Sequence, residues 1–264
     1  MDNASNLVLK RMGVINVTPN SFSDGGELLT PLMVEERVKS FGAIEALDVG
    51  AESTAPKNKS ISFTEEWERL EAHLPYLKSL NIPISIDTYH PETIQRMGEM
   101  WISEKIPAPL IWNDVSGKFD DTVKSFLESN DKFFYVFCHN LAPTRELSGR
   151  HMDYISENEG SDFLDELADH LKTGIHERVI LDPTLGFSKT FEQNIYILNH
   201  FEELQRKVGH NKWLLGFSRK SFLRKAFQTE NKEELDQIHG VILKKSIKNA
   251  KGELWIRTHR PELI

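Results

Sequence analysis

The sequence has a single cysteine, Cys138, among its 264 residues, so the chain cannot form an internal disulfide. A lone thiol is typical of proteins in a reducing compartment, and we expect the cytoplasm. The sequence also lacks an apolar run of roughly 20 residues, the length that spans a membrane. Its first residues lack the positive charge that begins a signal peptide. These absences predict no membrane span and no secretion.

Positive charge is also scarce: 32 Lys and Arg stand against 40 Asp and Glu, giving a formal net charge of −8. Nucleic acids and anionic membranes select basic surfaces, so neither is expected as the main partner. A locally basic cleft can still attract an anionic small molecule. The composition therefore favours a small-molecule enzyme over a nucleic-acid or membrane protein.

Low-complexity tracts and linkers are absent too, which predicts one α/β domain over residues 1–264. Eight short apolar runs each end on a polar residue, at a mean spacing of about 34 residues, close to the plan of a (β/α)8 TIM barrel. A doubly wound sheet is the alternative, but it needs only five or six strands. We expect strands over Met12–Asn16, Ala46–Val49, Ile84–Asp87, Leu110–Asn113, Phe134–Cys138, Val179–Asp182, Trp213–Gly216 and Leu254–Arg257.

Apolar residues at three- and four-residue spacing predict helices between these strands. The segment Leu141–Gly160 is instead rich in turn formers and histidine, and we expect a mobile rim loop there. After the last strand only Thr258–Ile264 remains, so the final helix should be short or missing. The expected helices are Leu32–Ala46, Phe63–Leu80, Pro91–Trp101, Asp121–Glu128, Asp162–Gly174, Phe191–Val208 and Ile238–Asn249, with a shorter one after Ser218.

A long polar loop follows Asn16 and runs to about Thr30. Loops of more than about 12–15 residues are uncommon in compact domains and are usually functional or disordered. We interpret this one as a catalytic lid. A surface turn is the alternative.

Polar side chains stand at or just after the strand ends, which in such a barrel converge on one face. Singly, an Asp or Asn there is most simply a helix cap or an Asx turn. Together they exceed what capping requires. Asp87 and Asp182 suit the paired N–H groups of a flat heterocycle, while the basic residues after the last two strands suit an anion. The set is Asn16, Asp48, Asp87, Asn113, Asp114, His139, Asp182, Lys220, Arg257 and His259.

Seven motifs follow one another from residue 12 to residue 259. The first reads Met12-Gly-Val-Ile-Asn-Val-Thr-Pro-Asn-Ser-Phe-Ser-Asp-Gly-Gly26, and the fifth reads Asp182-Pro-Thr-Leu-Gly-Phe-Ser-Lys-Thr190. The others are Asp48–Pro56, Ile86–Thr88, Asn113–Gly117, Gly216–Ser221 and Arg257–His259. In this order the motifs resemble dihydropteroate synthases, the pterin-binding TIM-barrel family of folate biosynthesis.

The resemblance implies that 6-hydroxymethyl-7,8-dihydropterin diphosphate and 4-aminobenzoate condense to 7,8-dihydropteroate, releasing diphosphate. It implies Asp87, Asn113, Asp182 and Lys220 at the pterin, and Asn16, Arg257 and His259 at the diphosphate. Mg²⁺ would bridge Asn16 and the leaving group. Thr54, Pro56, Phe187 and Ser221 would border the aminobenzoate beside Lys220. The residues expected to take part directly in catalysis are Asn16, Lys220, Arg257 and His259.

The sequence departs from the family pattern in both early loops. Ala55 replaces a usual arginine and Asn20 a usual aspartate. Because one change removes a positive charge and the other a negative charge, we hypothesise an ion pair in relatives that this chain has lost. The fifth motif has Thr184 where glycine is usual. A short C-terminus would leave apolar barrel surface to be covered by the first ten residues or by a second subunit, as in a homodimer.

Two other functions stay open at this point. A degenerate pterin-binding paralogue is suggested by Ala55, Asn20 and the short C-terminus. A methyltetrahydrofolate-dependent methyltransferase would use a similar barrel but needs no diphosphate residues.

Single residues outside the motifs carry weaker expectations. Cys138 is most simply a small buried side chain. His139 either lines the pterin pocket or bonds to backbone. We expect His73, His90 and His170 at the surface.

Overall fold

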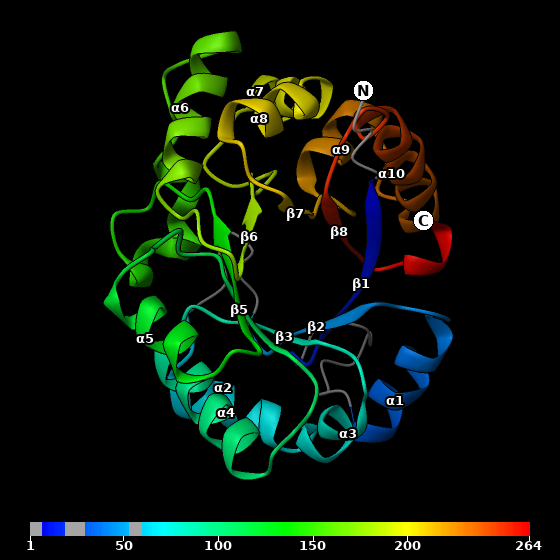
Figure 1. The fold of residues 1–264 in the computed structure, drawn as a ribbon. Helices are drawn as coiled ribbons and strands as arrows, with labels where there is room; N and C mark the ends of the chain where they lie inside the picture. The colour runs from blue at the N-terminus through cyan, green and yellow to red at the C-terminus, as the bar shows by residue number, and fades with distance from the viewer. Residues whose placement is uncertain (1–6, 19–29, 53–59) are drawn as a thin grey trace, which may run out of the picture.

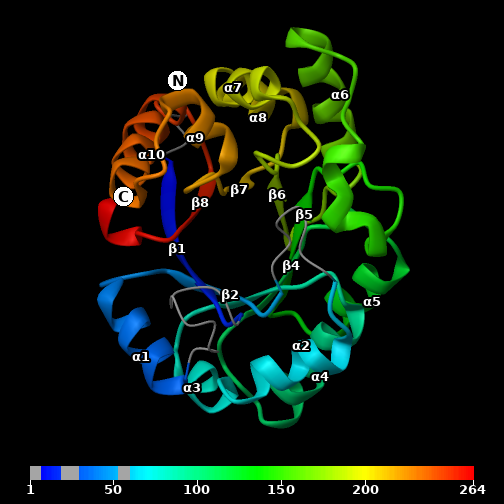
Figure 2. The ribbon, with the colours of Figure 1, turned by 180° about the vertical axis from the view of Figure 1, so that it is seen from behind.

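The computed structural model describes residues 7–18, 30–52 and 60–264. Eight parallel strands form a closed barrel in sequence order, and β8 pairs with β1. Figures 1 and 2 show the helices arranged around it. The predicted TIM barrel is confirmed and the doubly wound sheet is wrong. The strands are β1 (Val8–Asn16), β2 (Ala46–Gly50), β3 (Ile84–Asp87), β4 (Leu110–Asp114), β5 (Phe133–Cys138), β6 (Val179–Asp182), β7 (Lys212–Leu215) and β8 (Glu253–Thr258).

The helices lie between these strands. Several start on a short polar side chain that accepts a backbone N–H from the first turn, the usual N-cap arrangement. Thr190 and Gln193 form a full capping box at α7. The helices are α1 (Pro31–Ser40), α2 (Phe63–Glu71), α3 (Leu74–Ser79), α4 (Pro91–Ser103), α5 (Asp121–Ser129), α6 (Gly160–Lys172), α7 (Phe191–Asn199), α8 (Phe201–Val208), α9 (Ser221–Phe227) and α10 (Lys232–Ser246), with 3-10 helices η1 (Arg145–Asp153) and η2 (Pro261–Leu263).

Several predicted boundaries are wrong. The helix expected over Leu32–Ala46 ends at Ser40, because the chain turns through Gly42, whose φ of 67° is left-handed. β7 stops at Leu215 rather than Gly216, because its pairing with β8 ends there.

Three helix predictions also need correction. The single helices expected over Phe63–Leu80 and Phe191–Val208 are each two, the second broken at His200. The last long helix is Lys232–Ser246, not Ile238–Asn249, because Asn231 caps it by accepting two backbone N–H groups.

The strands alternate between two hydrophobic clusters, as the two-residue period of a strand requires. One set of side chains packs between barrel and helices, for example Leu47, Ile86 and Leu181. The other forms a separate cluster that faces the barrel interior, and we call it the amino-end plug because four of its members, Ala46, Ile111, Ile180 and Trp255, sit in the first halves of their strands. It comprises Met12, Ala46, Ile111, Val136, Cys138, Ile180, Leu214 and Trp255.

The segment expected as a mobile rim loop, Leu141–Gly160, contains the 3-10 helix η1. Arg145 of η1 binds the carboxylates of Asp114 and Asp120. Asn140 and Ser188 add hydrogen bonds at its base. The segment is therefore anchored to β4 and to the turn after β6, a contact that turn-forming composition does not reveal.

After β8 the chain forms the short helix η2, which lies between α10 and α1 in Figures 1 and 2. Arg37 of α1 donates to the carbonyl of His259 at 2.7 Å and joins the two segments. Val241 is 71% exposed and Leu263 is 42% exposed. Covering by a second subunit stays a prediction, and residues 1–6 lie outside the described part.

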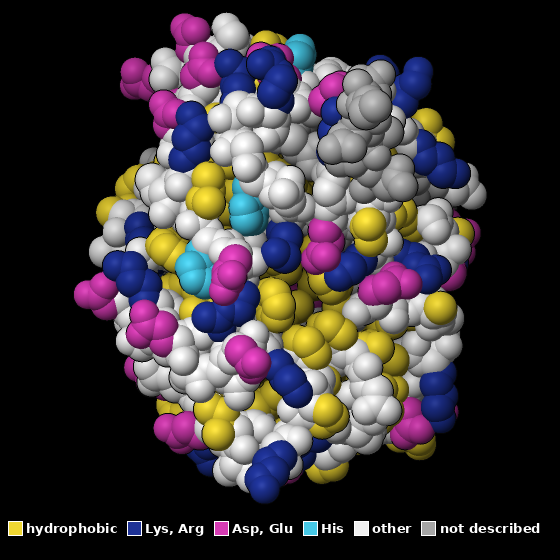
Figure 3. Space-filling model, viewed as in Figure 1, with side chains coloured by type: hydrophobic (Ala, Val, Ile, Leu, Met, Phe, Trp, Pro, Cys, Tyr) yellow, Lys and Arg dark blue, Asp and Glu magenta, His cyan; other side chains and the backbone are white. Residues whose placement is uncertain are grey.

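One face of the molecule exposes a group of hydrophobic side chains (Figure 3). Figure 3 shows hydrophobic side chains gathered in the middle of the face seen in Figure 1, with Lys, Arg, Asp and Glu around them. None of the described helices has the length and apolar character needed to cross a membrane.

Candidate active site

Asp48 is the buried carboxylate that joins the polar strand ends. Its side chain is fully buried. Oδ1 accepts Ser85 Oγ at 2.6 Å and Asn113 Nδ2 at 3.1 Å, and Oδ2 accepts Arg257 Nε at 2.7 Å. Four strands thus meet at one side chain. Sequence reasoning placed Asp48 in the converging set but gave it no role, because its partners are far away in the chain.

Asp87 and Arg257 form the next pair, with Nη2 donating to Oδ2 at 2.6 Å. Burial raises the pKa of Asp87 to about 7, an effect that Arg257 opposes and Asp48 increases. Burial also disfavours charge on Arg257, but Asp48 and Asp87 together raise its pKa above the ordinary value. Arg257 therefore stays charged, and its guanidinium is fixed by two carboxylates.

Asp182 ends β6 and accepts the Thr184 N–H at 2.7 Å. Burial raises its pKa to about 6, while that N–H and the Lys220 ammonium lower it. Burial, with Arg257, lowers the pKa of Lys220 to about 8. At neutral pH most molecules therefore hold a carboxylate on Asp182 near an ammonium on Lys220.

Phe187 lies between His151 and Lys220. Its ring stacks on His151 of η1 with centroids 4.0 Å apart, and Lys220 Nζ lies 4.2 Å from the ring centroid. Only 8% of Phe187 is exposed. Sequence reasoning missed His151, which comes from the segment expected as a loop and carries no motif signal.

His259 follows β8, and its Nδ1 lies 3.3 Å from Ser218 Oγ. Burial and the neighbouring Arg219, Arg257 and Arg37 lower its pKa to about 3. The sequence-based count of His259 among the cations is therefore wrong, because the imidazole is neutral. The surrounding arginines supply the positive charge instead.

Arg37 and Arg219 were not predicted for the site. Arg219 belongs to the same motif as Lys220 and is held by Asp236 through bonds of 2.9 and 2.6 Å. Arg37 comes from α1, and no sequence signal links it to β8. The anion end thus holds more positive charge than the motifs indicate.

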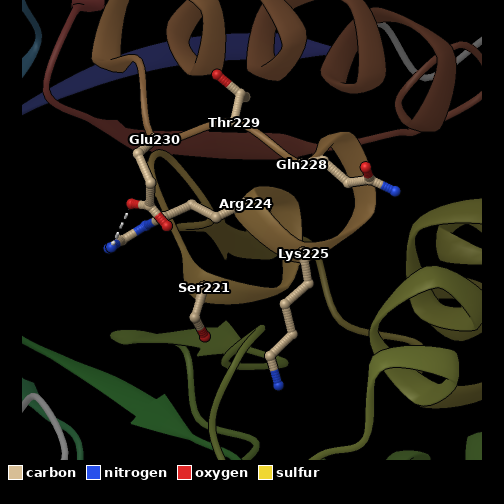
Figure 4. Close-up of a pocket in the computed structure, with 6 residues that line it drawn as sticks. All are labelled: Ser221, Arg224, Lys225, Gln228, Thr229 and Glu230. Atoms are coloured by element: carbon tan, nitrogen blue, oxygen red, sulfur yellow. Dashed lines mark hydrogen bonds and ion pairs between the residues drawn. The ribbon is translucent and has the colours of Figure 1, made fainter.

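Ser221 begins α9 and is exposed. It lines a pocket of about 370 Å³ with Arg224, Lys225 and Glu230. In Figure 4 Ser221 and Lys225 point to the same side, whereas Arg224 reaches Glu230. Of the described residues predicted at the aminobenzoate, Ser221 alone lines this pocket.

Asn16 ends β1 beside Gly50. A Cβ added at Gly50 would lie 3.2 Å from Asn16 Oδ1 and 3.5 Å from Asp87 Cβ, so glycine keeps that space open. No cluster of three His, Cys, Asp or Glu side chains suited to a metal occurs in the described residues. Mg²⁺ usually takes one or two protein oxygens and completes its shell with water and phosphate. The amide oxygen of Asn16 fits that pattern.

Two members of the predicted converging set have other tasks. Asp114 follows Asn113 and so points away from the barrel interior, where it binds Arg145, the Ser116 N–H and Tyr135. His139 is buried and accepts from Lys189 through Nδ1. Neither binds a described residue of the Asp48 network.

The surface expectation is wrong for His73, whereas His90 and His170 are half-buried. His73 is only 2% exposed, and His170 stacks on Phe137 with centroids 5.3 Å apart. His90 is half-buried, with Nε2 3.4 Å from the carboxylate of Glu52. Cys138 is buried as predicted. Of the remaining predicted positions, Asn20, Thr54, Ala55 and Pro56 lie outside the described residues.

Comparison with known proteins agrees with the resemblance that the sequence motifs indicate. The family model for pterin binding enzymes matches residues 12–259. Dihydropteroate synthase from Synechocystis sp. is 32% identical over 235 residues, which are 84% of this chain and 76% of the relative. Dihydropteroate synthase from Neisseria meningitidis serogroup B is 30% identical over 260 residues, 95% of this chain and 87% of the relative.

A solved structure agrees with these sequence matches. Dihydropteroate synthase from Clostridium difficile, crystallised in the presence of pteroic acid, matches with a TM-score of 0.78 and 28% identity. The match covers 99% of this chain and 94% of that one. The chain therefore belongs to the pterin-binding enzyme family, with the dihydropteroate synthases of folate biosynthesis.

Proposed function

We propose that the carboxyl end of this barrel binds a pterin at one side and a diphosphate at the other, for a single transfer reaction. The reaction is that of a dihydropteroate synthase, a transferase. The bond from the pterin methylene carbon to diphosphate breaks, a bond from that carbon to the aminobenzoate nitrogen forms, and the amine loses a proton. The substrates are 6-hydroxymethyl-7,8-dihydropterin diphosphate and 4-aminobenzoate.

The observation that carries the proposal is the Asp48 network. Asn113 and Arg257 both bind Asp48, so a residue proposed for the pterin and one proposed for the diphosphate are set by the same buried carboxylate. Such pre-set donors stabilise charge that develops in a transition state without reorganising. The fixed distance between them suits one substrate that carries both a heterocycle and a diphosphate.

Charge at the pterin end supports the assignment of Asp182, Asp87 and Lys220. The carboxylate of Asp182 would accept N–H groups from the pyrimidine edge, a strong, charge-assisted hydrogen bond. As diphosphate leaves, positive character grows on the pterin, and the carboxylates stabilise it. Lys220 would border both the pterin and the aminobenzoate, because it lies over Phe187.

At the diphosphate end, Arg257 and neutral His259 would donate hydrogen bonds to the leaving group. Asn16 would hold Mg²⁺ through its amide oxygen. When bound, that ion supplies positive charge next to the diphosphate oxygens. Arg37 and Arg219 add positive potential at His259. The aminobenzoate would lie against Phe187 and Ser221, with Thr54 and Pro56 as further proposed contacts.

One assay tests this function. Purified protein with pterin diphosphate and Mg²⁺ should release diphosphate and form dihydropteroate only when 4-aminobenzoate is added. Asn113→Ala should lose activity by roughly 10²-fold or more, since a preorganised donor is removed. Ser103→Ala is the control, because this hydroxyl binds only the Met100 carbonyl at an exposed site.

The degenerate pterin-binding paralogue makes the opposite prediction. It would bind the pterin diphosphate with measurable affinity but form neither product. A methyltransferase would transfer a methyl group from methyltetrahydrofolate and would not respond to 4-aminobenzoate. The anion end favours the synthase over both, because binding a pterin alone does not require it.

A further inference from the structure

Lys189 carries a buried amino group to which the proposed reaction gives no task. It lies between β6 and α7, is 2% exposed, and donates to neutral acceptors. Burial lowers its pKa to about 7. Its Nζ binds His139 Nδ1 at 2.9 Å and the carbonyls of Phe187, His139 and Thr184 at 2.9, 3.2 and 3.3 Å. Burying an ammonium is unfavourable unless its donors are used. Four neutral acceptors converge on this amino group.

The acceptors belong to two segments. Thr184 and Phe187 are in the turn that follows β6, and His139 follows β5. Thr184, Gly186 and Ser188 have φ values of 54°, 87° and 50°, all in the left-handed region. Non-glycine residues adopt that region only when the surroundings hold them there. The ammonium binds this turn from inside and attaches it to the end of β5.

His139 is suited to accept rather than to donate at Nδ1. Burial and the adjacent Lys189 keep its pKa well below the ordinary value, so the ring is neutral. Its other nitrogen, Nε2, is buried without a hydrogen-bond partner among the described residues. The proton therefore resides on Nε2, and Nδ1 offers its lone pair to Lys189.

The same turn carries Phe187, whose ring is seated against His151 and Lys220. Lys189 fixes the Phe187 carbonyl, while His151 and Lys220 fix its ring. A methionine would fill the volume of Lys189 without the desolvation penalty, but it would leave three carbonyls without this donor. The hydrogen-bond pattern thus points to a task for the N–H donors of Lys189.

We propose that Lys189 is a positioning residue, which holds the turn Pro183–Ser188 so that Phe187 forms the wall of the aminobenzoate site. This inference rests on the proposed assignment of Phe187 to aminobenzoate. The backbone of Asp182 belongs to β6, and only its bond from the Thr184 N–H comes from the turn. The pterin end should therefore depend less on Lys189. Loss of Lys189 should therefore affect one substrate much more than the other.

The test is Lys189→Met, with steady-state kinetics for 4-aminobenzoate and calorimetric binding of pterin diphosphate with Mg²⁺. We expect the KM for 4-aminobenzoate to rise about tenfold or more, because a misplaced contact wall weakens orientation. The pterin Kd should stay within about threefold, since β6 holds Asp182. An inactive wild type would refute the proposed function instead, so the two failures are distinguishable.

Lys118→Met is the matched control. Lys118 is a half-buried lysine whose Nζ likewise donates to a carbonyl, that of Ala142, at 2.7 Å. It does not bind the turn after β6. Its removal should leave the KM for 4-aminobenzoate within about twofold.

A double-mutant cycle shows whether Lys189 acts through Phe187. If it does, Lys189→Met should change the KM little in a Phe187→Ala background, because coupled residues are not additive. Additive effects would overturn the inference. So would an unchanged KM in the single variant, or equal losses for both substrates, which indicate a general structural role.

If Lys189→Met shows no cooperative thermal transition, Lys189→Gln replaces it. Glutamine keeps N–H donors for the carbonyls but has no charge, so a smaller rise in the KM for 4-aminobenzoate is expected. An unchanged KM for 4-aminobenzoate in a folded Lys189→Gln protein would also overturn the inference.

Discussion

The two ends of the barrel interior differ although the same strands build both. Ala46, Ile111, Ile180 and Trp255 belong to the amino-end plug. Two residues further along the same strands stand Asp48, Asn113, Asp182 and Arg257. Because side chains repeat every two residues along a strand, both sets face inward. The amino-end plug stabilises the fold through burial of apolar surface. The polar set holds buried charges, which are unfavourable unless they are paired or bind a ligand.

The largest effect is expected for Asp48→Ala. Arg257 would lose one of its two carboxylates and Asn113 its acceptor, and breaking a buried ion pair costs about 3–5 kcal/mol. We expect kcat/KM to fall by roughly 10²–10³-fold as well, because preorganised donors lose their positions. Denaturant unfolding and steady-state kinetics measure the two changes.

Ser85→Ala is the control for that variant, since it removes one neutral hydrogen bond to the same carboxylate. It should cost only about 1 kcal/mol and leave kcat/KM within a fewfold of wild type. If both variants lose activity equally, the charge of Asp48 is not what organises the site.

Ile180→Ala tests the amino-end plug in β6, the strand that also carries Asp182. Ile180 is 1% exposed within the amino-end plug. Truncation should destabilise the fold by about 2–5 kcal/mol through lost burial and a cavity. kcat/KM should stay near wild type below the unfolding temperature. A selective loss of pterin binding would show that the two ends are not separable.

Asp182→Asn should have effects opposite to those of Ile180→Ala. It should stabilise the fold and abolish pterin binding. The carboxyl ionises near 3.8 when unfolded, whereas burial raises its folded pKa to about 6. The contribution of Asp182 to the stability of the fold is therefore complete below about pH 4, where the carboxyl is protonated in both states, and is lost as the pH rises through about 6. We expect a gain on the order of 2–3 kcal/mol at pH 8 and almost none at pH 4.

Thermal unfolding of wild type and Asp182→Asn across this pH range tests the sign. Wild-type pterin affinity should rise as the pH increases through about 6, since the carboxylate is the binding form. The stability of Asp182→Asn is compared with that of wild type at the same pH. A smaller gain at pH 8 than at pH 4 would contradict the account.

The smallest expected effect concerns Thr184, which adopts a φ of 54° where relatives usually have glycine. Its hydroxyl accepts the His139 N–H and donates to the Asp182 carbonyl, both at 2.9 Å. Thr184→Ala removes these bonds and keeps the strain, whereas Thr184→Gly relieves the strain. The glycine variant should be more stable than the alanine variant by about 1 kcal/mol. If the alanine variant is instead more stable than the glycine variant, the backbone at residue 184 is not strained.

Much of the fold was predictable because its signals are local. Apolar runs and their spacing indicated eight strands, and β3 and β6 have the predicted bounds. Helix ends were less predictable. Gly42, His200 and Asn231 set them through conformation and capping, and such features do not alter hydrophobic period.

For the site, the sequence indicated which residue types converge but not which of them touch. Asn113 and Asp114 are adjacent in sequence and face opposite sides of the barrel wall. His259 follows a strand end as a cation would, yet burial among arginines makes it neutral. Charge state depends on neighbours such as Arg37, which lies 222 residues away in the chain.

The sequence by itself therefore determined the eight-strand plan, the polar strand ends and the family resemblance, because these follow from periodicity and motif order. Only the tertiary structure decided that Asp48 joins Asn113 to Arg257 and that η1 places His151 against Phe187. It also decided that a buried Lys189 binds the turn after β6. The physical reason is that hydrogen bonds and burial act over a few ångströms in space, and closing the barrel brings together residues that the chain separates.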